Sequence, residues 1–186
     1  MRVFYQGTKP TQGYGKHDVG HDVYLAEGVI IEAGAIMPTL AKLDLRTEFD
    51  ADQFGMAAVP RSSLSKLPLI QANSFGVLEG DYRGQWKMPL RALMIELSAY
   101  KGTSVLTMDE DGDATTLSIS EIPTEVQKRY GVNSERCIRN GSVYLPKGLR
   151  VAQAFPIHKE EIDWIETETL YDTPRGEGGF GSSGAN

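Results

Sequence analysis

The sequence is short of cysteine, of long apolar runs and of positive charge, and each shortage argues against a class of protein. Cys137 is the single cysteine, so no disulfide can form within the chain, which fits a reducing compartment. No apolar run approaches the roughly 18 residues of a membrane span, and the first residues, MRVFYQGTKP, lack the apolar core of a secretory signal. The formal net charge of −6 disfavours nucleic acid as the main partner. We therefore expect a cytoplasmic protein that binds neither membrane nor nucleic acid.

Short β-type runs make up most of what is present. They are rich in Val, Ile, Leu and aromatic residues, they are separated by glycine, proline and acidic residues, and they are too short for stable helices. They cover residues 2–6, 22–25, 28–39, 42–46, 54–59, 67–72, 85–97 and 149–157. This spacing predicts an all-β fold, a jelly roll or distorted barrel. With 186 residues, 40% of them hydrophobic, the chain fits one compact domain.

A segment of about residues 101–146 departs from this pattern. Two β-like runs flank an Asp-Gly turn in SVLTMDEDGDATTLSIS, which predicts a hairpin. The following SEIPTEVQKRYG predicts one short helix, because Ile122, Val126 and Tyr130 share a face and Gly131 can end the helix. We interpret the segment as an insertion on a β scaffold.

Several familiar sites fail on spacing or context. The acidic turn at residues 109–113 resembles the start of a calcium loop, but its glycine falls one place early and the closing glutamate is missing. His17 and His21 have the spacing of a helical zinc pair, yet Val19 and Gly20 between them make a helix unfavourable. GEGGFG satisfies the dinucleotide-binding pattern, but no helix can follow it so near the end of the sequence. We expect none of these three sites.

Five polar clusters remain, and each alone has an ordinary explanation such as a helix cap or a turn. They are DVGHDV (18–23), PRSSLSK (60–66), NSFGVLEGDYRG (73–84), LRVAQAF (149–155) and PRGEGGFGSSG (174–184). Together and in this order they resemble the five motifs of the trimeric dUTPase family, over the whole chain except the insertion. The resemblance implies a β jelly roll, a homotrimer with active sites at its interfaces, and magnesium-assisted hydrolysis of dUTP to dUMP and pyrophosphate. Such an activity limits uracil in DNA and supplies dUMP.

The resemblance implies roles for the residues that would meet the phosphates. Asp22 matches the acidic residue that holds magnesium through water, with Asp18 a weaker match. Arg61 and Ser62 match the phosphate-contacting pair, and charge-assisted hydrogen bonds from arginine suit a triphosphate. Gln153 matches the strand glutamine that reaches the phosphates.

The resemblance also implies how the base and sugar would be selected. Asn73 matches the side chain that bonds the uracil edge, and backbone groups from residues 74–77, including Gly76 and Val77, would complete the slot. A narrow slot of this kind would exclude cytosine by its hydrogen-bond pattern and thymine by its methyl group. Tyr82 matches the ring beneath the deoxyribose, which leaves no room for a 2′-hydroxyl.

The glycine-rich end matches a mobile arm that closes over the nucleotide of a neighbouring subunit. We expect one β domain at 1–170 and the arm at 171–186. Within the arm, Phe180 would stack on uracil, and Arg175 would contact the γ-phosphate. The residues expected to wrap the phosphates are Gly181, Ser182 and Ser183, since glycines permit close backbone approach.

One departure from the family falls on the catalytic base. The family has aspartate in this motif, whereas GVLEG places Glu79 there. Glutamate has nearly the same acidity as aspartate, but displacement of a catalytic group by ~1 Å can cost about a hundredfold in rate. Three interpretations stay open: the backbone retreats and Glu79 still activates water, the enzyme is slow or serves a related deoxynucleotide, or the fold is kept for binding. We assign catalysis to Glu79 with Asp22 and Arg61.

Two further departures define the alternatives. PRSS replaces the usual PRSG, and Ser63 adds a hydroxyl near the phosphates. Because the related dCTP deaminases carry a similar RSS, a pyrophosphatase for dCTP or a modified dUTP is one alternative. The insertion lies before the fourth motif, as in some bacteriophage dUTPases, where it can contact regulatory proteins. A nucleotide-switched regulator that binds a protein partner through residues 101–146 is the second alternative, with the host cytoplasm as its location if the origin is viral.

Overall fold

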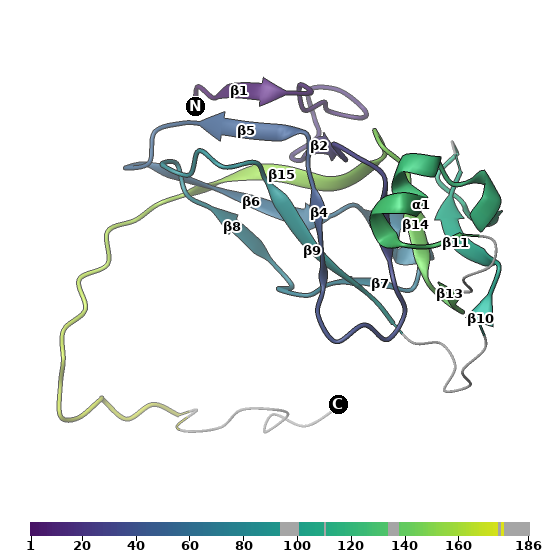
Figure 1. Ribbon diagram of the computed structural model, residues 1–186. Helices are drawn as coiled ribbons and strands as arrows, with labels where there is room; N and C mark the ends of the chain where they lie inside the picture. Colours follow the sequence, from purple (N-terminus) through teal and green to yellow (C-terminus); the bar gives the residue numbers. More distant parts are fainter. Residues whose placement is uncertain (94–100, 110, 134–137, 175, 177–186) are drawn as a thin grey trace.

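The computed structural model describes residues 1–93, 101–109, 111–133, 138–174 and 176. These residues are mostly strands, arranged as three sheets of three or four strands and two strand pairs (Figure 1). The predicted all-β fold is confirmed. No helix in this part of the chain is both long and apolar enough to cross a membrane.

The sheet that matters most for the site is antiparallel and has the strand order β2-β15-β6-β8. Its strands are β2 (His21–Tyr24), β6 (Phe54–Pro60), β8 (Gly76–Leu78) and β15 (Arg150–His158). The central strands β15 and β6 pair along seven residues, from Ala152 opposite Pro60 to His158 opposite Phe54. Strands β2 and β8 therefore lie at opposite edges of this sheet.

A second sheet is antiparallel, with the order β4-β9-β7. Its strands are β4 (Thr39–Lys42), β9 (Lys87–Ala92) and β7 (Leu69–Gln71), while β1 (Phe4–Gly7) pairs separately with β5 (Leu45–Glu48). Side chains alternate as a half-buried sheet requires: Met88, Leu90 and Ala92 of β9 point into the core. Trp86, just before β9, is 1% exposed, and its indole N–H donates to Thr47 Oγ1 at 3.1 Å.

The inserted segment combines with scaffold strands in a third sheet of order β12-β11-β14-β3. Its strands are β3 (Val29–Ile31), β11 (Ser104–Met108), β12 (Ala114–Ser118) and β14 (Val143–Leu145), and a short pair joins β10 (Lys101–Gly102) to β13 (Ile138–Arg139). The predicted hairpin is confirmed as β11–β12. Val143 and Leu145, within the range predicted as inserted, are fully buried in the main core.

The insertion has its own apolar core beside the main one. Its buried members are Ile30, Val105, Ile119, Ile122, Val126, Ile138 and Tyr144. Helix α1 (Thr124–Tyr130) buries Val126 there and ends at Gly131, whose φ of 62° is left-handed and suits glycine. The predicted helix is thus present, but its predicted start is wrong. Pro123 disfavours helical geometry in the residue before it, so Ile122 is extended and separates α1 from the 3₁₀ turn η2 (Ile119–Glu121).

The long run 28–39 is a second correction. It forms β3 and only the first residue of β4, with a turn between them. Gly34 takes a left-handed φ of 68°, and Ile36 and Met37 are 88% and 75% exposed. A glycine turn followed by Pro38 therefore ends the first strand although the sequence stays apolar.

The insertion core predicts a pH effect at Tyr144, which is 5% exposed. Burial raises the pKa of Tyr144 above its ordinary value, and the Glu125 carboxylate raises it further. A phenol whose pKa is raised by folding stabilises the fold below its unfolded pKa of about 10, and this contribution is lost as the pH rises through the folded pKa. In an alkaline titration followed by tyrosinate absorbance, Tyr144→Phe should remove a group that ionises above a pH of about 10. Loss of a group that ionises at or below that pH would contradict the burial argument.

Candidate active site

Asp22 is the centre of the first group of predicted site residues. It lies in β2 and is 1% exposed. Arg61 Nε is 2.9 Å from Asp22 Oδ1, and Arg150 Nη1 is 3.2 Å from Oδ2. Arg61 follows the end of β6, where its backbone N–H donates to Val151 O at 2.9 Å, so three strands hold this group together.

The charges of this group leave it net positive. One carboxylate faces two guanidinium groups, and both arginines are partly exposed, with side-chain exposures of 24% and 44%. Gln153 stands directly opposite Asp22 in the β15–β2 register and donates to Oδ1 at 3.4 Å. A Cβ on Gly20 would come within 3.1 Å of Gln153 Cβ, so glycine gives that side chain room. The arrangement suits an anion.

The segment after Arg61 adds two hydroxyl groups. Residues Ser62–Lys66 form a 3₁₀ turn, η1, anchored by buried Leu64. Ser62 is exposed. The Oγ of Ser63 is buried and has no hydrogen-bond partner in the described part of the chain. A buried hydroxyl without a partner is unfavourable, so Ser63 is a group that a ligand oxygen could satisfy.

The surroundings of Asp22 limit how a metal ion could bind. Both carboxylate oxygens already accept hydrogen bonds from arginine, so direct coordination would have to displace them. Among the described residues no three His, Cys, Asp or Glu side chains are grouped to hold a metal ion. A Cβ on Gly13 would be 3.8 Å from both Asp18 Oδ2 and Asp22 Oδ2, so these two carboxylate oxygens both lie close to Gly13. Two neighbouring carboxylates suit an ion held through its water shell, as magnesium often is.

The second group lines a pocket of about 280 Å³. Its walls are Ala58, Gln71, Asn73, Gly76, Val77, Leu78, Glu79, Tyr82, Lys87 and Met88. Asn73, Gly76, Val77, Glu79 and Tyr82 were predicted from sequence, and the segment that leads from β7 through β8 toward β9 brings all five together. Its turn holds Ser74 at a φ of 58°, a left-handed conformation that is uncommon for residues other than glycine and occurs often at functional sites.

Glu79 is an exposed member of this pocket wall. Within the described residues its carboxylate has neither a hydrogen bond nor an ion pair, whereas its backbone carbonyl accepts from Tyr82 N–H at 3.1 Å. A carboxylate that the rest of the chain does not engage is available to water and to a ligand.

Tyr82 depends on a nearby glycine. The Tyr82 hydroxyl donates to Gln85 O at 3.1 Å, and a Cβ on Gly84 would come within 2.3 Å of that hydroxyl oxygen. The ring therefore lies directly over Gly84.

Gln71 and Lys87 belong to the pocket but were missed from sequence. Gln71 is the single polar residue of the run LPLIQA, and Lys87 is one of two charged residues in KMPLR. A polar residue at a buried strand position could have been a signal, since such groups need a partner. Nothing in the local sequence indicates which partner it has.

The two groups are centred on different strands. Asp22 lies on edge strand β2 and Val77 on the opposite edge strand β8, whereas Arg61 follows β6, the neighbour of β8. Three strand spacings separate these edges, about 14 Å. The predicted arm residues Arg175, Phe180, Gly181, Ser182 and Ser183 lie outside the described residues.

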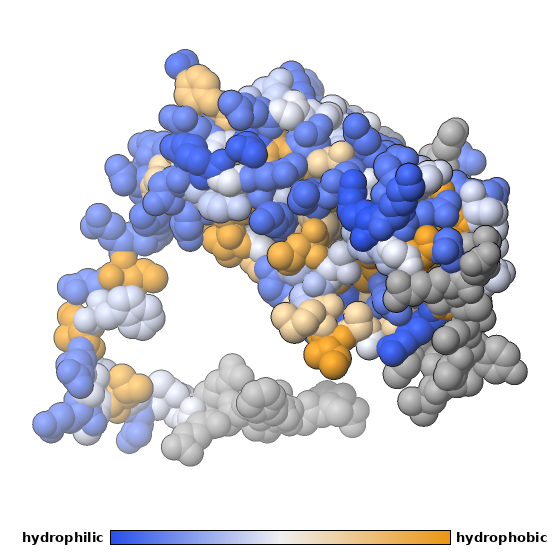
Figure 2. Space-filling view, viewed as in Figure 1, coloured by the Kyte–Doolittle hydropathy of each residue, from blue (hydrophilic) through white to orange (hydrophobic). Residues whose placement is uncertain are grey.

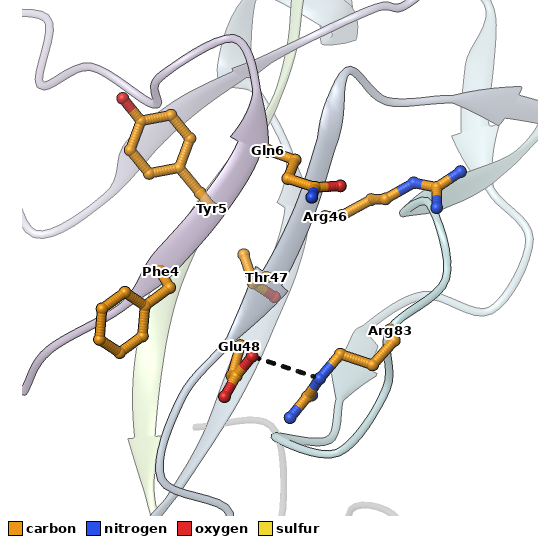
Figure 3. Close-up of a pocket in the computed structure, with 7 residues that line it drawn as sticks. All are labelled: Phe4, Tyr5, Gln6, Arg46, Thr47, Glu48 and Arg83. Atoms are coloured by element: carbon orange, nitrogen blue, oxygen red, sulfur yellow. Dashed lines mark ion pairs between the residues drawn. The ribbon is translucent and has the colours of Figure 1, made fainter.

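Another cavity, of about 390 Å³, lies on the outer side of the β1–β5 pair (Figure 3). Phe4 and Tyr5 line it from β1, and Arg83 reaches toward Glu48 with 3.7 Å between Nε and Oε2. None of the predicted site residues lines this cavity. The 280 Å³ pocket with Glu79 is therefore the candidate active site.

Proteins that resemble this chain in sequence and in fold are dUTPases. No protein-family profile matches the chain. It is 28% identical over 174 residues to a deoxyuridine 5'-triphosphate nucleotidohydrolase of Rickettsia prowazekii, covering 91% of this chain and 84% of that protein. The equivalent protein of Rickettsia massiliae is 29% identical, with the same coverage.

The fold is that of phage dUTPases. The Staphylococcus bacteriophage 80alpha dUTPase with dUPNHPP superposes with a TM-score of 0.75 at 21% identity, over 98% of both chains. A dUTPase of phage phi11 of S. aureus, described with a species-specific insert, gives 0.68 at 16% identity over 93% of this chain and 100% of that one. A point variant of the phi11 protein is described with a structural Mg(II) ion.

The contact between Tyr82 and Gly84 predicts a conditional stability effect. Gly84→Ala should destabilise the fold by about 1–3 kcal/mol, because the new methyl group overlaps the Tyr82 ring. In a Tyr82→Ala background the same substitution should have little effect, since the ring is gone. Both free energies of unfolding come from chemical denaturation. An equal cost in the two backgrounds would show that the ring is not the cause.

Proposed function

Since this chain belongs to the dUTPase family, we propose that it hydrolyses dUTP to dUMP and pyrophosphate. The observation that carries the proposal is the pocket in which Asn73, Tyr82 and the unengaged Glu79 carboxylate meet on one segment of ten residues around β8. These three residues supply a hydrogen-bonding group for a base, a ring for a sugar and a general base for water. A role in binding alone would not explain why an unpaired carboxylate lies in the wall of this pocket.

The reaction is in-line displacement at the α-phosphorus. The Glu79 carboxylate accepts a proton from water as the water oxygen bonds to the α-phosphorus. The bond from that phosphorus to its bridging oxygen breaks, and the electron pair leaves with pyrophosphate. Positioning of the water is the main contribution of Glu79, since the effect of a general base depends on its reach.

The group around Asp22 would bind the phosphates. Arg61 donates charge-assisted hydrogen bonds to phosphate oxygens, Ser62 and Ser63 supply hydroxyl donors, and Gln153 completes the group. Asp22 holds Arg61 in place and would hold a magnesium ion through water, and the ion would neutralise part of the triphosphate charge. In the arm, Phe180 would stack on uracil, Arg175 would meet the γ-phosphate, and residues 181–183 would close over the chain of phosphates.

We propose that the active protein is a homotrimer. The centres of the two groups, Asp22 on β2 and Val77 on β8, lie on opposite edge strands about 14 Å apart, which suits a site shared between chains. The outer face of β4-β9-β7 and the turn before it expose Ile36, Met37, Leu40 and Ile70 at 43–88%. Figure 2 shows apolar side chains gathered on the side of the body that faces the extended C-terminal segment. Exposed apolar surface of this kind is typical of interfaces.

The C-terminal segment supports the same assembly. Residues 160–172 contain six acidic and no basic residues, and the rest of the chain has equal numbers of the two, so this segment carries the whole net charge of −6. It leaves the body after β15 (Figure 1) and exposes Trp164, Ile165 and Tyr171 at 79–100%. Exposed apolar side chains along an extended segment are stabilised when they pack against another surface, and a neighbouring copy would provide one.

A regulatory role through the insertion is the second candidate function. Lys66, at the end of η1, pairs with Asp113 in the β11–β12 turn. A protein bound to that turn would therefore act on the segment that carries Ser62 and Ser63. The 80alpha protein is described among phage dUTPases that control transfer of virulence genes by a proto-oncogenic G protein-like mechanism. Hydrolysis requires Glu79, whereas partner binding requires the turn, so the two functions are separable.

The first test measures pyrophosphate release from dUTP, dCTP, dTTP and UTP with magnesium and after its removal with a chelator. We expect strong preference for dUTP and loss of activity without magnesium. Glu79→Gln keeps the shape but removes the base, so kcat for dUTP should fall about 10²–10⁴-fold. The matched control is Asp81→Asn, an exposed carboxylate two residues away that does not line the pocket, and its kcat should change little. Comparable turnover of dCTP would contradict uracil as the preferred nucleobase. Full activity in Glu79→Gln would contradict Glu79 as the general base.

The second test concerns assembly. Light scattering of the purified protein should give three times the mass of the 20.4 kDa chain. Ile70→Asp places a charge on the exposed face of β7 and should lower both the mass and the activity, because a buried unpaired charge opposes association. Phe4→Asp, on the β1–β5 pair, should leave the mass unchanged. A wild-type protein with the mass of one chain would refute the trimer.

A further inference from the structure

Gln71 is a buried amide beside the pocket to which no role has been given so far. It ends strand β7, is 8% exposed, and lines the same 280 Å³ pocket as Asn73. Asn73 is exposed and lies two residues further on, in the turn between β7 and β8. The two amides are in direct contact.

Two acceptors fix the orientation of Gln71. Its Nε2 donates to the backbone carbonyl of Ala58, 3.4 Å away, and to Asn73 Oδ1, 2.8 Å away. A backbone carbonyl can only accept hydrogen bonds, so the Gln71 atom beside it has to be the NH₂ group. Reversal of the Gln71 amide would place two oxygens against each other at Ala58.

This orientation leaves the oxygen of Gln71 without a partner. Gln71 Oε1 is buried and has no hydrogen-bond partner within the described residues. An unpartnered buried acceptor is unfavourable, but two opposed oxygens at Ala58 would be more so. The fold thus leaves one acceptor unsatisfied while the NH₂ group stays between Ala58 and Asn73.

The orientation of Gln71 decides that of Asn73. Because the Gln71 atom that faces Asn73 is a donor, the Asn73 atom that faces it must be the oxygen. The remaining polar atom of Asn73 is Nδ2, which carries two hydrogens and accepts nothing. The pocket therefore presents a donor, although an isolated asparagine could present either end.

We infer that Gln71 is a specificity-determining positioning residue, which holds Asn73 with its NH₂ group toward the base and so selects a pyrimidine with a 4-keto group. This inference rests on the proposed function, which supplies the pyrimidine. A 4-keto oxygen accepts a hydrogen bond from Asn73, whereas a 4-amino group faces it with a second donor. A site that leaves polar groups unpaired against the wrong substrate discriminates strongly.

Without Gln71 the discrimination should weaken. Asn73 is exposed, so its amide could rotate by half a turn and offer its oxygen to a 4-amino group. The chemistry of the reaction would be unaffected, because Gln71 touches neither Glu79 nor the phosphate group in any hydrogen bond among the described residues. The effect belongs to base selection and should appear in KM.

The test compares Gln71→Met with the wild type. Methionine has a similar length and no hydrogen-bonding group, so the ratio of kcat/KM for dUTP to that for dCTP should fall about tenfold, which corresponds to about 1.4 kcal/mol. The KM for dUTP should rise and kcat should stay nearly constant. Gln127→Met is the matched control, since Gln127 Nε2 also donates to a backbone carbonyl, that of Ile122 at 2.6 Å, far from the pocket wall. It should leave the ratio unchanged.

A second variant reverses the polarity. Gln71→Glu offers acceptors to Asn73. The NH₂ group of Asn73 should then face residue 71 and the oxygen of Asn73 should face the nucleobase. The ratio of kcat/KM for dUTP to that for dCTP should therefore fall further than in Gln71→Met. In an Asn73→Ala background, neither substitution at position 71 should change the ratio. Melting temperatures of all variants check that they fold.

Binding of dUMP and dCMP, measured by calorimetry, separates this inference from the proposed function. If the wild type prefers dUMP and Gln71→Met loses that preference, the inference holds even when dUTP is not hydrolysed. An unchanged dUMP-to-dCMP preference in both folded position-71 variants would overturn it. So would an effect that persists in the Asn73→Ala background, because Gln71 would then act without Asn73.

Discussion

A carboxylate removed from water between two guanidinium groups is the constraint on which the rest of the site depends. Asp22 is 1% exposed, and an isolated buried charge would be strongly unfavourable, so the fold has to bring Arg61 and Arg150 to it. The three residues come from different parts of the chain, and their contact fixes β2, the end of β6 and the start of β15 relative to one another. Both guanidinium groups are partly exposed, so this group offers a local excess of positive charge although the chain as a whole has a net charge of −6, as the proposed binding of a triphosphate requires.

The base pocket is built by a different principle. Its polar groups include two amides and an unpaired carboxylate within residues 71–79, and the directions of the amides are set by hydrogen bonds that begin at a backbone carbonyl. Gly84 leaves space for Tyr82, and Gly76 lets β8 approach β6, since a Cβ there would lie 3.1 Å from Ala58 O. In the proposed function, charge attracts the phosphates in one group, while hydrogen-bond direction and steric fit select the nucleoside in the other. A site divided in this way allows affinity and specificity to be changed independently.

The insertion is held mainly by apolar packing. Its core unites Val105, Ile119, Ile122 and Val126 with Ile30 of the scaffold. The ion pair between Lys66 and Asp113 is exposed, with side-chain exposures of 48% and 66%, and such pairs add at most about 1 kcal/mol. Packing therefore keeps the insertion in place, and the ion pair adds a weak link to η1 that binding of a partner could break.

Local patterns in the sequence determined the strand-rich fold, the hairpin at residues 104–118, the glycine that ends α1, and the five residues of the pocket wall that belong to one motif. These depend on turn residues and on spacing within a dozen positions, which the sequence displays directly. The break in the run 28–39 and the late start of α1 were misjudged, because Gly34 and Pro123 override the apolar pattern around them. Only the tertiary structure decided that Asp22 is held by Arg150, that Asp22 and Val77 lie on opposite edge strands of one sheet, and that Gln71 donates to Asn73. Each of these results depends on which strand lies beside which, and the direction of a hydrogen bond is fixed only when its partner, distant in the sequence, is in place.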